Sequence, residues 1–147
     1  MTDRNQYAPI ISELNKHYIS FSQAIGEYLK SFTEDILLSF SFSKEEIKVI
    51  LKLHYIFAAS AVNFLEKTDS FVASLTKFLY DAYDKNDQDT VIKLGKIISR
   101  QFDCKDHISS FIRVCEEAIK ADGQNVSPRA LYKEATIFKK KFDALLN

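Results

Sequence analysis

Apolar side chains recur at steps of three and four positions in the first part of the chain. Between residues 8 and 38 the repeat is carried by Ile11, Leu14, Tyr18, Phe21, Ile25, Tyr28 and Phe32. This spacing is that of a helix with one face in a bundle seam, and the flanking positions lack the paired charges of an exposed two-stranded coiled coil. The pattern predicts a long first helix over residues 8–38.

A second long helix, antiparallel to the first, is predicted from residue 44 to about residue 67. Ser43 and Glu46 have the spacing of a capping box. Along one side lie Ile47, Ile50, Leu51, His54, Phe57, Ala58, Ala61, Phe64 and Leu65, and Val49, Leu53, Ile56 and Val62 widen that stripe. We expect this to be the most buried helix, with His54 a hydrogen-bonded core histidine. Its apolar run is shorter than the roughly 20 residues of a membrane span, and Lys52 interrupts it.

The rest of the chain also has helical periodicity. Thr68, Asp69 or Ser70 can cap a third helix that ends before the polar stretch 84–89. Two further helices carry apolar residues at 91–102 and 108–119. Gln101 and Lys105 would lie on the apolar stripe of a continuous helix, so we predict that these two helices are separated by a break. One bent helix is the alternative.

The last helix is predicted to open at Ser127-Pro128, an N-cap followed by a proline in the first turn. Only three glycines and two prolines interrupt 147 residues, which is too few for a β-rich chain. Twelve phenylalanines and seven tyrosines predict a core rich in aromatic rings. The fold class expected is therefore all-α: one domain over residues 1–147, a bundle of five to six helices with two long antiparallel helices first.

Charge and cysteine content narrow the function classes. Twenty basic and twenty acidic side chains cancel, so the overall field favours neither nucleic acid nor anionic lipid. The N-terminus lacks the basic-then-apolar run of a signal peptide, so a cytoplasmic or otherwise intracellular location is expected. Cys104 and Cys115 would lie roughly 16 Å apart on one helix, too far for a disulfide.

No metal or cofactor site is predicted. Cys104 and His107 have the spacing of two ligands on one helical turn, but nothing nearby completes a zinc shell. The acidic stretch 84–89 lacks the glycine and glutamate of a calcium loop. The glycines Gly26, Gly95 and Gly123 are isolated, so no phosphate-binding loop exists either.

Arg100 and His107 have six residues between them. This pair resembles the Arg-x(4 to 6)-His signature of the HEPN ribonucleases, small all-α proteins. The resemblance implies a metal-independent ribonuclease in which Arg100 and His107 act together on the scissile phosphate. The alternative interpretation is that Arg100 is a cation near a helix C-terminus and His107 a partly exposed residue at a helix start.

The last helix carries a basic ridge, formed by Arg129, Lys133, Lys139, Lys140 and Lys141. This ridge is the predicted partner-binding surface, and a solvated lysine face is its alternative. Since no catalytic constellation is found, we expect a non-enzymatic protein–protein interaction module: an adaptor, an inhibitor or immunity-type protein, or a regulatory protein. The alternative is a nucleic-acid-directed protein, either the HEPN-like ribonuclease or a binder that uses the last helix. The partner is expected to be another protein, and a homo-oligomer is compatible with the sequence.

Overall fold

The computed structural model describes residues 4–121 and 127–146. These residues are 90% helical and contain no strand. They form five helices, which are α1 (Arg4–Lys30), α2 (Glu34–Leu38), α3 (Lys44–Asp84), α4 (Gln88–Ala121) and α5 (Pro128–Ala144). The predicted all-α fold is confirmed.

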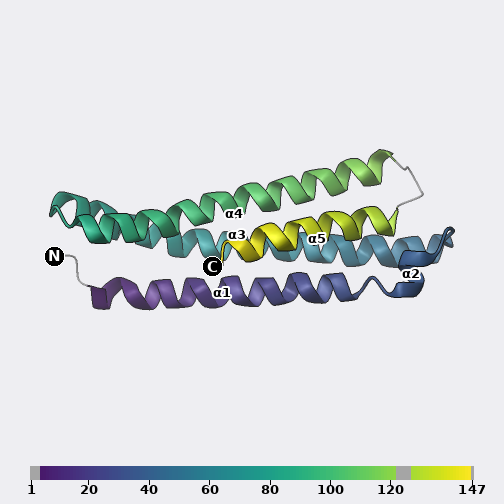
Figure 1. Cartoon of the computed structure of the whole chain (residues 1–147), viewed down its shortest axis with the longest axis horizontal. Coiled ribbons are helices and arrows are strands. Elements are labelled where there is room, and N and C mark those ends of the chain that lie inside the picture. The colour runs from purple at the N-terminus through teal and green to yellow at the C-terminus, as the bar shows by residue number, and fades with distance from the viewer. Residues whose placement is uncertain (1–3, 122–126, 147) are drawn as a thin grey trace.

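The four longer helices run alternately up and down the long axis (Figure 1). α3 packs against both α1 and α4, and α5 packs against the same two helices. The antiparallel packing of the first two long helices agrees with the prediction. Figure 1 shows the C-terminus near the middle of the long axis, so α5 accompanies the other helices only over the part of the bundle next to α2.

The first helix is shorter at its C-terminal end than predicted. α1 ends at Lys30, and Thr33 caps the separate helix α2 by accepting a hydrogen bond from the Ile36 backbone N–H at 3.3 Å. A Thr side chain that bonds the backbone three residues later starts a new helix instead of continuing the old one. α1 also begins before Ala8, so Pro9 lies inside it.

The predicted boundary at residues 68–70 is wrong, because α3 is continuous over 41 residues, a length of about 60 Å. The Thr68 hydroxyl donates to the Phe64 carbonyl at 2.9 Å, and the Ser70 hydroxyl donates to the Lys67 carbonyl at 2.7 Å. Both side chains therefore bond back to the preceding turn, as Ser and Thr do within helices, and neither caps a helix start.

The predicted break between Arg100 and His107 is also wrong, because α4 runs unbroken from Gln88 to Ala121. Gln101 does lie on the buried face, where it is only 2% exposed. The Gln101 side-chain amide is hydrogen-bonded to side chains of α1 and α3. Because these bonds replace those to water, the amide can be buried in a continuous helix. Cys104 and His107 consequently lie in the middle of α4 and not near a helix start.

The core is built from aromatic rings, as the composition predicts. Stacked pairs join Phe21 to Phe64 and Tyr28 to Phe57, each with ring centroids 4.4 Å apart. Phe111 of α4 stacks on Phe138 of α5 at 4.8 Å. These contacts hold α1 to α3 and α4 to α5.

Candidate functional site

One face of α3 exposes apolar side chains to solvent. Val49 is 59%, Leu53 39% and Ile56 57% exposed, and their spacing of four and three residues aligns them along the helix. We call these three residues the α3 stripe. The sequence prediction placed them in the widened core of the most buried helix, and that placement is wrong.

By its length and hydropathy, α3 also meets the criteria for a membrane-spanning helix. An 18-residue window of α3 has a mean hydropathy of 1.3, so length and composition alone would let this helix cross a membrane. The expectation that its apolar run is too short is not supported by this measure. The core helix of a globular protein passes the same test when it is mostly buried, but only 28% of this window is buried. Much of the apolar surface of α3 therefore faces outward from the bundle.

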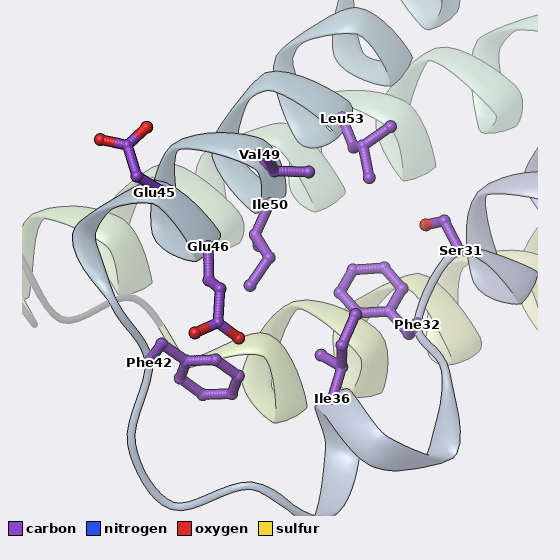
Figure 2. A pocket seen from close by; sticks show the side chains of 9 residues that line it. All are labelled: Ser31, Phe32, Ile36, Phe42, Glu45, Glu46, Val49, Ile50 and Leu53. Atoms are coloured by element: carbon purple, nitrogen blue, oxygen red, sulfur yellow. The ribbon is translucent and has the colours of Figure 1, made fainter.

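The α3 stripe borders a pocket of about 270 Å³ between α2 and the start of α3. Its apolar lining consists of Phe32, Ile36, Phe42, Val49, Ile50 and Leu53, and Ser31, Glu45 and Glu46 complete it. Figure 2 shows Phe32 and Ile36 facing Val49, Ile50 and Leu53 across the hollow. We call this hollow the α2–α3 pocket.

The local sequence explains why the hollow exists. Because α1 ends at Lys30 and the chain turns aside into α2, the side chains opposite Val49 and Leu53 are Phe32 and Ile36, and a hollow remains between them. Phe42 in the linker that follows α2 is half-buried and closes one side. The other linker phenylalanine, Phe40, is almost fully exposed, so of the two only Phe42 packs against the core.

Two carboxylates are the charged groups of the pocket lining. Glu46 Oε1 accepts a hydrogen bond from the Ser43 backbone N–H at 3.1 Å, completing the predicted capping box. Figure 2 shows the Glu46 carboxylate turned toward Phe42 and the hollow, whereas Glu45 points away from it. Glu45 pairs with Lys48 at 3.6 Å. No Lys, Arg or His is among the residues that line this pocket, so the charged groups of its lining are both acidic.

The basic residues predicted as a ridge do not share one environment. Arg129 donates from Nε to the Leu37 carbonyl and lies 5.1 Å from the Phe40 ring centroid, so it ties α5 to α2 and to the linker that follows α2. Lys139 pairs with Asp143 at 2.6 Å and reaches the Ser22 hydroxyl of α1. The remaining three, Lys133, Lys140 and Lys141, are exposed.

Asp143 is held in its ionised form by these contacts. Partial burial opposes ionisation, but hydrogen bonds from Lys139 and Ser22 outweigh it and lower the pKa of this carboxyl. Lys139 therefore belongs to the α1–α5 contact, and the exposed part of the ridge is smaller than the sequence predicts.

Arg100 and His107 lie on the same side of α4, about 10 Å apart along its axis. The Arg100 guanidinium carbon lies 4.2 Å from the Tyr18 ring centroid, and Nη2 donates to Asn15 Oδ1 at 2.9 Å. Arg100 is thus directed at α1, and His107 is partly buried two turns further on. Nothing in this geometry brings the two side chains to one point, which the HEPN resemblance would require.

A buried polar cluster joins three helices near the middle of the bundle. The Tyr18 hydroxyl donates to Gln101 Oε1, and Gln101 Nε2 donates to Thr68 Oγ1 at 2.7 Å and Asp69 Oδ1 at 3.0 Å. Lys105 pairs with Asp69 at 2.9 Å. Burial raises the pKa of the Tyr18 hydroxyl well above its usual range, so it stays a donor. This cluster is closed by its own members and is structural.

The other buried titratable groups are also engaged or inert. His54 is 1% exposed, and its Nδ1 lies 2.9 Å from the Tyr28 hydroxyl, which confirms it as a hydrogen-bonded core histidine. Burial raises the pKa of both Cys104 and Cys115 to about 12. Among residues 4–121 and 127–146, no group of three or more His, Cys, Asp and Glu side chains is arranged to hold a metal ion.

Comparison with known proteins adds no assignment. No protein-family model, curated protein or solved structure matches this chain. The α2–α3 pocket and the α3 stripe are therefore judged on their own chemistry.

Sequence reasoning missed this site although a signal for it was present. Apolar residues between positions 47 and 65 occupy more of the helix circumference than one buried face can use. The excess, which includes Val49, Leu53 and Ile56, had to remain outside if α3 was packed on one side only. Which part of a wide stripe becomes the outside is decided by tertiary packing.

Proposed function

We propose that this protein is a non-enzymatic protein–protein interaction module that binds its partner through the α3 stripe and the α2–α3 pocket. One observation carries the proposal: a hollow with a largely apolar lining opens directly onto an exposed apolar helix face. Contiguous apolar surface of this kind is rare on monomeric proteins and marks interaction sites.

The partner surface must be apolar and elongated. Three aligned side chains from Val49 to Ile56 span about 10 Å along α3. The pocket, at about 270 Å³, lies just below the usual 300 to 1,000 Å³ of small-molecule sites. It is sized for an anchor side chain of a larger partner.

The other surfaces give less support to a function. Arg129 and Lys139 are occupied within the fold, so a partner of the α5 ridge would meet mainly Lys133, Lys140 and Lys141. Arg100 packs on Tyr18, so no observation favours phosphate chemistry at that position. The interaction module on α3 is the function that we put forward.

The test compares two sets of exposed apolar residues. A photo-cross-linking residue is placed at Val49, or at Ile92 on α4 as the control, in cells that express the protein, and the captured protein is purified. Its dissociation constant is then measured by calorimetry for wild type, the double variant Val49→Gln/Ile56→Gln, and Ile92→Gln. Ile92 is a matched control because it is 57% exposed, as is Ile56, but lies on another helix.

We expect the double variant to weaken binding by about 2 kcal/mol, roughly 30-fold, because two apolar contacts are lost. The Ile92→Gln variant should bind within about twofold of wild type, because it changes a surface outside the site. Both variants should melt close to wild type. Unchanged binding of the double variant would show that the partner docks elsewhere.

A further inference from the structure

We propose that the segment docking on this site is an amphipathic helix that places a lysine or arginine against Glu46. This inference rests on the proposed function and names the chemistry of its partner. It is drawn from the direction of the α3 stripe, the size of the pocket and the charge of its lining.

The arrangement of apolar contacts favours a helical occupant. Val49, Leu53 and Ile56 form a straight row along α3, with a pocket at one end that admits a bulky anchor. A partner helix presents its own apolar residues at i, i+3 or i+4, and i+7, which can match such a row. Among the described residues there is no strand, so no sheet edge is present to which an extended peptide could add.

The charge of the lining requires a cation from the occupant. Glu46 is exposed to solvent, and its carboxylate faces the hollow in Figure 2, so a group that fills the pocket lies beside this carboxylate and removes part of its water. None of the ion pairs between described residues includes Glu46, and its hydrogen bond from the Ser43 N–H uses only one oxygen. Removing water from a carboxylate without supplying a counter-charge opposes binding, so a partner that binds well supplies one.

Neither a second copy nor a lipid surface satisfies this requirement. Two copies placed pocket to pocket would bring their Glu46 carboxylates together, which opposes association. A membrane with anionic lipids would repel the same carboxylate, and neutral lipid tails would leave it buried without a partner. A helical protein segment with a basic residue beside its apolar anchor meets both demands.

The experiment selects binders from a displayed library of helix-favouring peptides of about 15 residues, a length that covers the apolar surface of α3. Selection uses the full chain, with counter-selection against Val49→Gln/Ile56→Gln. Recovered peptides are synthesised, and their dissociation constants are measured for wild type, Glu46→Gln and Glu45→Gln. Glu46→Gln is informative because glutamine also completes a capping box, so the charge is removed while the helix start is kept.

Glu45→Gln is the matched control, because Glu45 points away from the pocket and is already paired with Lys48. We expect the peptides to share apolar residues at i, i+3 or i+4, and i+7 with a nearby lysine or arginine. Glu46→Gln should weaken binding about tenfold, and Glu45→Gln less than twofold. Replacing the peptide's basic residue with norleucine should cause a loss that is not additive with Glu46→Gln.

The remaining outcomes separate the two proposals. Peptides that need the α3 stripe but bind Glu46→Gln as well as wild type would overturn this inference and leave the proposed function standing. Failure to recover any peptide that distinguishes the double variant would overturn both. Dimerisation of wild type, or its binding to phosphatidylcholine–phosphatidylglycerol vesicles, would also overturn the inference if either were lost in the double variant.

Discussion

Single residues in this protein matter most where a polar group is buried among aromatic rings. His54 touches the Tyr28 hydroxyl and lies near the rings of Tyr55 and Phe111, and Gln101 is enclosed by three helices. In such surroundings a hydrogen bond adds little to stability when it is made, but its loss is expensive. The stability of the fold should therefore respond to protonation or substitution at these few positions.

Protonation of His54 should destabilise the fold in mildly acidic solution. Burial lowers its pKa in the folded state, and the Glu116 charge only partly opposes this. Below pH 6.5 the unfolded chain binds a proton that the folded chain excludes, so the free energy of unfolding falls as pH decreases from about 6.5 to the folded pKa. The slope from this group reaches at most about 1.4 kcal/mol per pH unit.

Urea unfolding at several pH values would measure this effect. His54→Gln should lower stability at pH 8 but flatten the decline below pH 6.5, whereas His17→Gln should retain the decline. An equal slope in wild type and His54→Gln would contradict the assignment.

Gln101 and Tyr18 should be energetically coupled. Gln101→Leu leaves the Tyr18 hydroxyl without its acceptor, and Tyr18→Phe leaves the Gln101 oxygen without its donor, so each should lose about 1–3 kcal/mol. The double variant should lose at least about 1 kcal/mol less than the sum, because no polar atom of the pair is then orphaned. Chemical denaturation of the four proteins measures this difference, and Tyr80→Phe, at an exposed tyrosine, should combine additively with Gln101→Leu.

At the scale of helices, side chains of one chemical type have two different roles. Ser43 lies outside α3 and caps it by accepting from the Glu46 N–H at 3.1 Å. Ser70 lies inside the same helix and bonds back to the Lys67 carbonyl. The two serines therefore offer a direct check of where α3 begins.

Replacing each serine with alanine should have different effects. Ser43→Ala should lower the free energy of unfolding by about 1 kcal/mol through loss of the cap. Ser70→Ala should be neutral or slightly stabilising, because alanine is the better residue within a helix. Thermal or urea unfolding of both variants measures these changes in the free energy of unfolding. A decrease of about 1 kcal/mol in Ser70→Ala would indicate a helix boundary at residues 68–70.

The start of a helix was predictable where the capping residue follows a segment without an apolar run. Ser43 and Ser127 begin α3 and α5 as the sequence predicts, because each is followed by an amphipathic run and has no apolar run directly before it. Thr68 and Gln101 misled the prediction because each is a polar residue on a buried face that bonds to the other across two helices, and Thr68 also bonds back to the Phe64 carbonyl. A one-dimensional pattern contains no information about that partner.

At the scale of the whole molecule, the two cysteines report on opening of the bundle. Cys104 and Cys115 are both buried on α4, and burial raises the pKa of each thiol to about 12, so almost no thiolate exists at pH 8. A thiol reagent should therefore react about 1,000-fold or more slowly with the folded chain than with the unfolded one.

Mass spectrometry of the labelled peptides would give a rate for each cysteine. If the bundle opens as one unit, both rates should be equal and should rise in parallel with urea. Faster labelling of Cys115 alone would reveal local opening at the end where α5 begins.

The site was predictable only in part at this scale. Sequence reasoning favoured a protein-binding function, which stays a proposal, but it placed the surface on α5, where Arg129 and Lys139 turned out to contact other helices. It treated Val49 and Leu53 as core because hydrophobicity alone does not say which neighbours a side chain has. The hollow beside them depends on where α1 ends, and that depends on the local cap at Thr33.

The polar cluster around Gln101 also constrains how this protein can diverge. A single substitution at Gln101, Thr68 or Tyr18 leaves a buried donor or acceptor without a partner. An evolutionary intermediate with only one of these substitutions is therefore less stable than its ancestor. Tolerated change at these positions should be concerted, with apolar residues replacing the group together. The α3 stripe is free of this coupling, so in diverging descendants its exposed residues can vary one by one while the three cluster positions are inherited as one unit.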